Sequence, residues 1–260
     1  MKCFKNAIFG TLLIAAFPQL LQAQVIFQED FEGEQLDLSH WNYEEGDGCP
    51  NLCGWGNEER QTYDRDYVEV KDGNLVITAA KEGDKYFSGR ITTKDKVEFQ
   101  YGEIEIRAKL PEGHGLWPAF WMLGADIAEV GWPQSGEIDI LEYVGREPNI
   151  LYTSLHYPAH HGGNATSKKT FLPDIEEGYH TYKAHWTKKE ISFYYDGQKV
   201  FTFIPETYDE VHYPYQKPFY ILVNMAIGGN FGGPEVDDSI FPAKYYIDYI
   251  KVTEIEDKDE

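Results

Sequence analysis

Apolar and polar residues alternate with a period of two along much of this chain. In residues 101–110, YGEIEIRAKL, the apolar side chains fall on one face and the charged side chains on the other. Such alternation predicts a half-buried antiparallel strand. Residues 74–80, 219–227 and 245–252 predict further strands, and the run at 219–227 is apolar enough to be buried on both faces.

Turn signals separate these runs. In ISFYYDGQKVFTF, residues 191–203, Asp196 and Gly197 predict a tight hairpin turn because both positions tolerate positive φ. We find no convincing long amphipathic helix, so the pattern predicts an all-β antiparallel sandwich. Residues 24–260 are long enough for one large β domain and contain no linker that would divide it.

The first 23 residues predict a secretory signal peptide. Lys2 and Lys5 precede an apolar stretch at 7–17, and LQA at 21–23 fits the small-residue rule, so Gln24 is the expected first mature residue. The alternative, a membrane anchor, needs an apolar run of about 20 residues. We therefore expect a secreted or periplasmic protein without a membrane span.

Charge and cysteine content restrict the partners further. The chain has 44 acidic and 23 basic residues, a formal net charge of −21, which argues against a nucleic-acid partner. Cys49 and Cys53 lie in the Gly/Pro-rich stretch GDGCPNLCGWG, which predicts one small disulfide in an exported protein. A pair of free thiols is the alternative, whereas a zinc site would need further ligands nearby.

GEIDILEYV, residues 136–144, carries three acids at uneven spacing: Glu137, Asp139 and Glu142. A regular strand would send the first two to one face and the third to the other. One residue absorbed in a β-bulge after Asp139 would turn Glu142 back beside its two companions. The alternative is a solvent-facing strand edge with Glu142 in a turn.

Carboxyl groups gathered in this way suit the hydrolysis of a glycosidic bond. One group protonates the leaving oxygen, and a second attacks the sugar or activates water. Close like charges raise the pKa of one carboxyl group and so keep it protonated. In GLWPAFWMLG, Trp117 and Trp121 share a strand face and predict a flat platform for sugar rings, although either tryptophan alone would also suit a core.

The stretches SGEIDILEYVG, GLWPAFWMLG, CGWGNEERQTY and ILVNMAIGGNFGGP together resemble glycoside hydrolase family 16. The E-x-D-x-x-E form resembles its laminarinase-like members, whereas lichenase-like relatives carry E-x-D-x-E. The resemblance runs from about Phe31 to Val252. It implies a β-jelly roll of two curved antiparallel sheets with an open cleft on the concave side.

The resemblance also implies roles for single residues. Glu137 matches the nucleophile, Glu142 the general acid/base, and Asp139 the helper that holds the nucleophile and tunes proton sharing. Trp117 and Trp121 match sugar platforms.

Four other positions match the family's cleft, each with a simpler alternative. Asn57 and Glu58 match positions that hydrogen-bond sugars on the non-reducing side, but a local turn would also explain them. Arg90 could line the cleft or form a surface ion pair. His156 resembles a cleft histidine near the leaving-group side, although a lone strand histidine is more often structural.

Members of the family often bind a calcium ion on the convex side. The matching positions are Asp30, Gly73 and Asp248, and such a site would be structural, built from backbone carbonyls, carboxylate oxygen and waters. No cofactor is expected for the chemistry itself.

These observations predict an exported, monomeric, retaining endo-β-1,3-glucanase that acts on laminarin-type chains. One alternative keeps the mechanism and changes the polymer to mixed-linkage β-glucan, agar or carrageenan, although the acidic charge argues against sulfated galactans. The other is a carbohydrate-binding jelly roll without turnover, which would have no need of three acids together.

Overall fold

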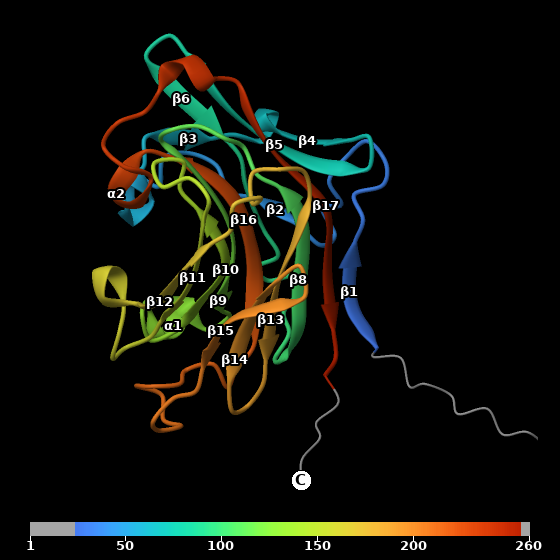
Figure 1. Cartoon of the computed structure of the whole chain (residues 1–260), viewed down its shortest axis with the longest axis vertical. Coiled ribbons are helices and arrows are strands. Elements are labelled where there is room, and N and C mark those ends of the chain that lie inside the picture. The colour runs from blue at the N-terminus through green and yellow to red at the C-terminus, as the bar shows by residue number, and fades with distance from the viewer. Residues whose placement is uncertain (1–23, 256–260) are drawn as a thin grey trace, which may run out of the picture.

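The computed structural model describes residues 24–255, which fold into two β-sheets stacked face to face (Figure 1). The first sheet has ten strands in the order β15-β14-β13-β8-β17-β5-β6-β3, with β1 also paired to β17 and β4 to β5. The second has seven, in the order β12-β11-β10-β9-β16-β7-β2. The pairing is antiparallel except between β3 and β6. The predicted signal peptide, residues 1–23, lies outside the described residues.

The strands of the first sheet are β1 Val25–Glu29, β3 Gln61–Tyr63, β4 Val68–Lys71, β5 Asn74–Glu82, β6 Lys85–Ser88, β8 Gly102–Lys109, β13 His180–Trp186, β14 Ile191–Tyr195, β15 Gln198–Phe203 and β17 Ala243–Thr253. Those of the second are β2 Asn42–Tyr43, β7 Arg90–Thr92, β9 Leu116–Gly124, β10 Glu137–Tyr143, β11 Ile150–His156, β12 Thr166–Phe171 and β16 Phe219–Ile227. Short helices fill some connections: α1 Ile127–Val130, α2 Gly229–Gly232, and 3₁₀ turns at Cys53–Gly56, Arg65–Tyr67, Gly162–Asn164 and Asp238–Ile240.

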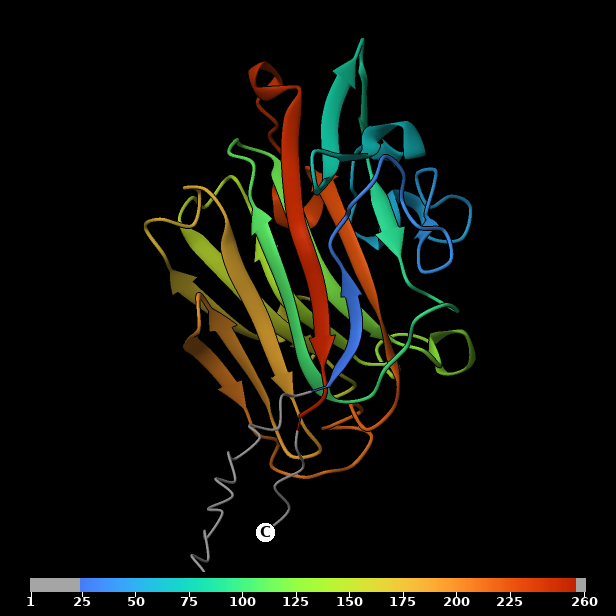
Figure 2. The ribbon, with the colours of Figure 1, turned by 90° about the vertical axis from the view of Figure 1, so that its right-hand side faces the viewer.

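The predicted strands are present where the alternation placed them. Figure 2 looks onto the first sheet, where β17 (red) lies between β1 (blue) and β8 (green). Every residue of β16 is buried, as its apolar run predicted. β14 and β15 form the predicted hairpin, with φ of +44° at Asp196 and +75° at Gly197.

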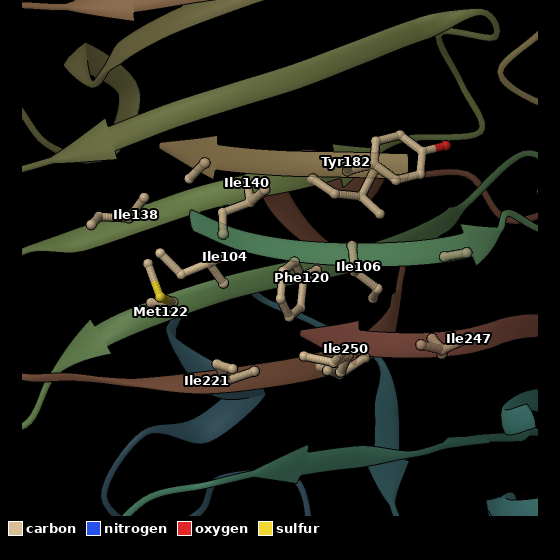
Figure 3. Packing of buried hydrophobic residues seen from close by; sticks show 14 of the residues in the cluster. Ile104, Ile106, Phe120, Met122, Ile138, Ile140, Tyr182, Ile221, Ile247 and Ile250 are labelled. Carbon is tan, nitrogen blue, oxygen red and sulfur yellow. The ribbon is translucent and has the colours of Figure 1, made fainter. Parts of the chain in front are cut away.

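The core lies between the two sheets and receives one face of each (Figure 3). β8 contributes Ile104 and Ile106 from the first sheet, while β9 contributes Phe120 and Met122 from the second. Full burial of such a side chain stabilises the fold by about 1.5–3 kcal/mol relative to exposure. The opposite face of the second sheet is thereby left available for other side chains.

The structure also describes the cysteine pair and the lengths of the helices. Cys49 and Cys53 form a disulfide, which resolves the choice between a bridge and free thiols. Within residues 24–255, no helix is long and apolar enough to cross a membrane.

Candidate active site

β10 carries its three acids on the face that points away from the core. The register of β10 shifts against β11 between Asp139 and Glu142, and against β9 between Asp139 and Leu141. The two residues in this gap, Ile140 and Leu141, are both buried in the core. The predicted bulge is therefore present, and it returns Glu142 to the face that carries Glu137 and Asp139.

Glu137 lies at the start of β10, next to the indole nitrogen of Trp132. Trp132, in the loop before β10, donates a hydrogen bond from Nε1 to Glu137 Oε2 over 2.7 Å. Burial, followed by the negative charge of Asp139, raises the pKa of Glu137 to about 8. In the free protein this carboxyl group therefore retains a proton near neutral pH.

Glu142 has a donor on each carboxyl oxygen. Trp117 Nε1 donates to Oε1 over 3.1 Å, and Ser154 Oγ donates to Oε2 over 3.3 Å. Ser167 on the neighbouring strand donates in turn to Ser154 Oγ over 2.9 Å. Burial and the charge of Asp139 nevertheless hold the pKa of Glu142 well above its usual range. Such a carboxyl group can deliver a proton at neutral pH.

An aromatic group flanks Glu142 on the side of Trp117. Phe231, from α2, packs edge-on against Trp117 with ring centroids 5.2 Å apart. Tyr152 on β11 packs edge-on against the same phenyl ring at 4.8 Å. The guanidinium of Arg146 lies 5.9 Å from the centre of Phe231. These contacts fix the orientation of the Trp117 indole.

Trp121 has a different neighbourhood, centred on a buried cation. The guanidinium of Arg90 lies 4.4 Å from the ring centre of Trp55 and 5.1 Å from that of Trp121. Glu44 forms an ion pair with Arg90, whose side chain is only 9% exposed. Arg90 is thus neither a solvated surface residue nor free to move, because two indoles and a carboxylate hold it.

A chain of hydrogen bonds ties Trp121 to the loop after the disulfide. Trp121 Nε1 donates to Asn224 Oδ1 over 2.7 Å, and Asn224 Nδ2 donates to the Tyr63 hydroxyl over 2.9 Å. The Tyr63 hydroxyl donates to Glu59 Oε2 over 3.0 Å. Every member of this chain has a partner, so the Trp121 platform is held rigidly.

The loop after the disulfide contains the two predicted sugar contacts. Asn57 is half-buried, and its Nδ2 donates to Glu59 Oε1 over 3.2 Å. Glu58 is exposed and has a left-handed φ of +57°. The acid in this loop that carries the hydrogen bonds is Glu59, whose pKa is raised by burial.

His156 lies on β11 directly opposite Glu137 in the strand register. Its Nε2 is 3.3 Å from Asp139 Oδ2 and 3.9 Å from Glu137 Oε1, and its side chain is 16% exposed. The strand pairing thus brings His156, Glu137, Asp139 and Glu142 together, with Trp117 beside them.

The three positions expected for calcium lie elsewhere, on the first sheet. Asp248 stands in β17 between the stretch paired with β5 and the stretch paired with β1. Gly73 precedes β5 and Asp30 follows β1, so the register brings all three positions to one region. Asp248 Oδ2 pairs with Arg107, and Asp30 accepts hydrogen bonds from Gln28. A calcium ion there would draw on Asp248 Oδ1 and on backbone carbonyl groups.

Five residues of this face escaped the sequence analysis. Asn224 had a readable signal, because it is the polar side chain within the apolar run FYILVNMAI. Trp132, in a loop, and Ser154, on a strand, showed no distinguishing periodicity. Glu59 lies in a loop and Phe231 in the four-residue helix α2, and neither segment is long enough for a period to show the side-chain direction.

The chain is similar to proteins of a known family. The profile of "Glycosyl hydrolases family 16" matches residues 56–251. The chain is 36% identical to "Glucan endo-1,3-beta-glucosidase A1" of Niallia circulans, over 90% of this chain but only 38% of the length of that protein. It is also 36% identical to "Beta-glucanase" of Rhodothermus marinus, over 88% of this chain and 84% of that one.

A solved structure agrees in fold as well as in sequence. The laminarinase from Flavobacterium sp. UMI-01 superposes with a TM-score of 0.87 and is 57% identical, over 89% of this chain and 100% of that one. This similarity supports the jelly-roll architecture expected from the sequence.

Proposed function

Because this chain belongs to the glycosyl hydrolases family 16, we propose that it cleaves β-1,3-glucan chains internally, with retention of configuration. The observation that carries this proposal is the bulge in β10, which brings Glu142 to the same face as Glu137 and Asp139. A nucleophile and a proton donor are then available on one side of a bound sugar. The similarity to laminarinases and to glucan endo-1,3-β-glucosidases supports the choice of polymer.

In the first step Glu142 gives its proton to the glycosidic oxygen while the carboxylate of Glu137 attacks the anomeric carbon. The bond from the anomeric carbon to the leaving oxygen breaks, and an ester to Glu137 forms. In the second step Glu142, now ionised, removes a proton from water, whose oxygen displaces Glu137 from the sugar. The raised pKa of Glu142 suits the first step, because the group arrives protonated.

Glu137 must lose its proton before it can attack. Trp132 Nε1–H and the Nε2 side of His156 both face its carboxyl oxygens. Donors of this kind favour the ionised form once a substrate is in place. Asp139, held between Glu137 and His156, is the acceptor to which the shared proton can move.

The tryptophans supply the binding surface for the polymer. Trp117 and Trp121 lie on one face of β9, each half-exposed and each held by a hydrogen bond through its Nε1. Sugar rings stack their C–H faces on indoles fixed in this way. We assign Asn57, Glu58 and Arg90 to the same surface on the non-reducing side, with Arg90 acting by holding Trp121.

The experiment is a product analysis on a panel of polysaccharides. The purified protein should release a series of oligosaccharides from laminarin, and NMR should show the β-anomer first. Release only from mixed-linkage glucan, agar or carrageenan would change the polymer, and binding without any release would favour a lectin. An initial α-anomer would contradict the retaining mechanism.

We also propose a structural calcium ion at Asp30, Gly73 and Asp248, remote from the chemistry. The ion would tie β1, β5 and β17 together where their pairing changes over. Calcium should then raise the melting temperature of chelator-treated protein without changing the KM for laminarin. Identical melting curves with and without calcium would remove the site.

Finally, we propose that the protein is exported and acts as a monomer, with Gln24 as its first mature residue. The Cys49–Cys53 disulfide supports export, because such bonds persist in oxidising compartments. Mass spectrometry of the protein recovered outside the cytoplasm should give the mass of a chain that begins at Gln24, and light scattering should give that of one copy.

A further inference from the structure

The two ring nitrogens of His156 face different kinds of partner. Nε2 points toward the acids, 3.3 Å from Asp139 Oδ2 and 3.9 Å from Glu137 Oε1. Among the described residues, Asp139 Oδ2 is a buried oxygen without a hydrogen bond of good geometry, and Asp139 is only 3% exposed. Burying a carboxylate oxygen without a hydrogen-bond donor costs free energy of folding. The nearest nitrogen, His156 Nε2, is therefore the donor that would lower this cost.

The other nitrogen faces a backbone amide. The N–H of Gly162 donates a hydrogen bond to His156 Nδ1 over 3.0 Å. A backbone N–H can only donate, so Nδ1 must present its lone pair. In a neutral imidazole the proton then resides on Nε2, which is the side that faces Asp139 and Glu137.

The loop that supplies this amide is internally braced. Tyr157 and His160 exchange two backbone hydrogen bonds, each of 2.9 Å. Gly162 begins a 3₁₀ turn with a left-handed φ of +56°, a conformation that glycine adopts without strain. The Tyr215 hydroxyl donates to the carbonyl oxygen of His156 over 3.0 Å, which holds the strand end in place.

Charges around His156 act against this neutral form. Burial lowers the pKa of His156, whereas the contact with Asp139 and the charges of Glu137, Asp139 and Glu142 push that pKa upward. The other groups near the ring are the Trp132 indole and, packed edge-on against that indole, His161. An imidazolium would carry a proton on Nδ1 that points at the Gly162 N–H, so the loop opposes the charge that the acids favour.

We propose that the loop from Tyr157 to Asn164 locks His156 as the neutral tautomer protonated on Nε2, which makes His156 a positioning residue for the nucleophile. This inference rests on the proposed function and deepens it. The Nε2–H donates to Asp139 at every stage. When Glu137 is esterified by the sugar, its carboxyl group can no longer share a proton with Asp139, and the histidine donor then keeps Asp139 Oδ2 paired without itself titrating.

The tautomer also has a consequence for metal ions. Glu137, Asp139 and His156 bring one ligand atom each within 4.8 Å of one another, a spacing that could hold a transition metal. A histidine ligand must offer a lone pair to the metal. With its proton on Nε2, His156 offers none on this side, so the acids remain free for catalysis.

The first test observes the tautomer directly in resting, ¹⁵N-histidine-labelled protein. His156 should show a protonated Nε2 and an acceptor Nδ1, unchanged between about pH 5 and pH 8, whereas exposed histidines titrate near pH 6.5. The resonance is assigned by its loss in His156→Gln. Protonation of both nitrogens at pH 6 would overturn the proposal. Because no substrate is present, this result is independent of whether the protein hydrolyses glucan.

The second test separates a neutral donor from a charge. Glutamine can place an amide N–H near the position of Nε2, whereas phenylalanine keeps a ring without a donor. His156→Gln should keep kcat on laminarin within about tenfold and leave the pH profile in place, while His156→Phe should lose about 10²-fold, the scale expected when a reacting group is misplaced.

A matched substitution outside this loop provides the control. His212 is half-exposed and contacts Thr207 and Asp209 rather than the acids. His212→Gln should therefore retain the kcat of the parent. Equal losses in His156→Gln and His156→Phe would show that the charge or the ring shape, and not the neutral donor, is what matters.

Discussion

Almost the same five residues lead into two strands of this protein. β8 starts with GEIEI at 102–106, and GEIDI at 136–140 enters β10 from the glycine before it. In both, the isoleucines enter the core while the acids face away from it. The pKa values of the first acids of the two strands are nevertheless shifted in opposite directions. The pKa of Glu103 is lowered to about 2, whereas that of Glu137 is raised to about 8.

The neighbouring strand accounts for this difference. Glu103 faces β13, where His185 Nδ1 lies 3.3 Å and Lys183 Nζ 3.0 Å from its carboxylate, and these partners lower its pKa in that order. Among the described residues, the close neighbours of Glu137 are His156, Trp132 and Asp139, and no lysine or arginine is among them. Facing partners therefore decide whether an acid stabilises the fold or keeps a proton for chemistry.

A second difference lies further along each strand. β8 continues its alternation through Arg107, which pairs with Asp248. β10 breaks its alternation and adds Glu142 to the same face, with no lysine or arginine among the hydrogen-bond partners described for it. The outward face of β10 therefore differs from that of β8 in two ways. It carries a third carboxyl group, and no lysine or arginine in the described part of the chain pairs with its acids.

The largest expected effect is on activity, when the same substitution is made at Glu137 and at Glu103. Glu137→Gln should lower kcat/KM on laminarin by at least about 10³-fold, because the nucleophile is lost, while binding of the glucan persists. Glu103→Gln should retain the activity of the parent. The measurement is the initial rate of reducing-end release, paired with a binding assay. Similar losses in both variants would erase the distinction between the strands.

The next effect isolates the proton donor. Glu142→Gln should lower the rate on laminarin by about 10²–10⁴-fold, the usual contribution of general acid–base catalysis. The rate of the first step should fall much less with an aryl glycoside whose leaving group needs no proton. The alkaline limb of the variant's pH–rate profile should disappear. Glu105→Gln on β8 is the control, since Glu105 accepts a hydrogen bond from Tyr249 on the outer surface. Equal loss on both substrates would assign another role to Glu142.

A smaller effect concerns the serine beside each acid. Ser154 Oγ donates to Glu142 Oε2, and on the first sheet Ser192 Oγ donates to Glu190 Oε1 over 3.1 Å. Removing a donor from a carboxylate raises its pKa, so Ser154→Ala should move the alkaline limb of kcat/KM to higher pH with a few-fold change in kcat. Ser192→Ala should leave the profile in place. A limb that moves to lower pH would contradict this role for Ser154.

The smallest effect is on stability and has opposite signs in the two strands. A pKa raised to about 8 means that Glu137 costs stability above the unfolded value of about 4.3, so Glu137→Gln should raise the melting temperature at pH 7 by about 2–4 °C, for roughly 1 kcal/mol. A pKa lowered to about 2 means that Glu103 stabilises the fold above about 4.3 and loses this effect as the pH falls toward 2. Glu103→Gln should therefore lower the melting temperature slightly. The measurement is calorimetry of both variants at pH 7. Melting temperatures that shift in the same direction in both variants would contradict the comparison.

The sequence predicted the sandwich and the bulge because both follow from side-chain periodicity. Alternation alone cannot distinguish GEIEI from GEIDI, since the difference lies in the facing strands β13 and β11, whose register alternation does not give. Trp132 and Glu59 could not be placed for the same reason, as they act from loops. The tautomer of His156 depends on a backbone amide, for which no sequence pattern exists.

The most direct measurement is to trap the intermediate on the enzyme. A 2-deoxy-2-fluoro laminaribioside with a reactive leaving group should glycosylate the protein once with loss of that leaving group, and mass spectrometry of the peptides should place the sugar on Glu137. Accumulation should persist in Glu142→Gln, where the second step is slowed. Labelling of Asp139 or Glu142 in the parent protein, or turnover of the reagent with no covalent adduct, would contradict the assignment of the bulged strand.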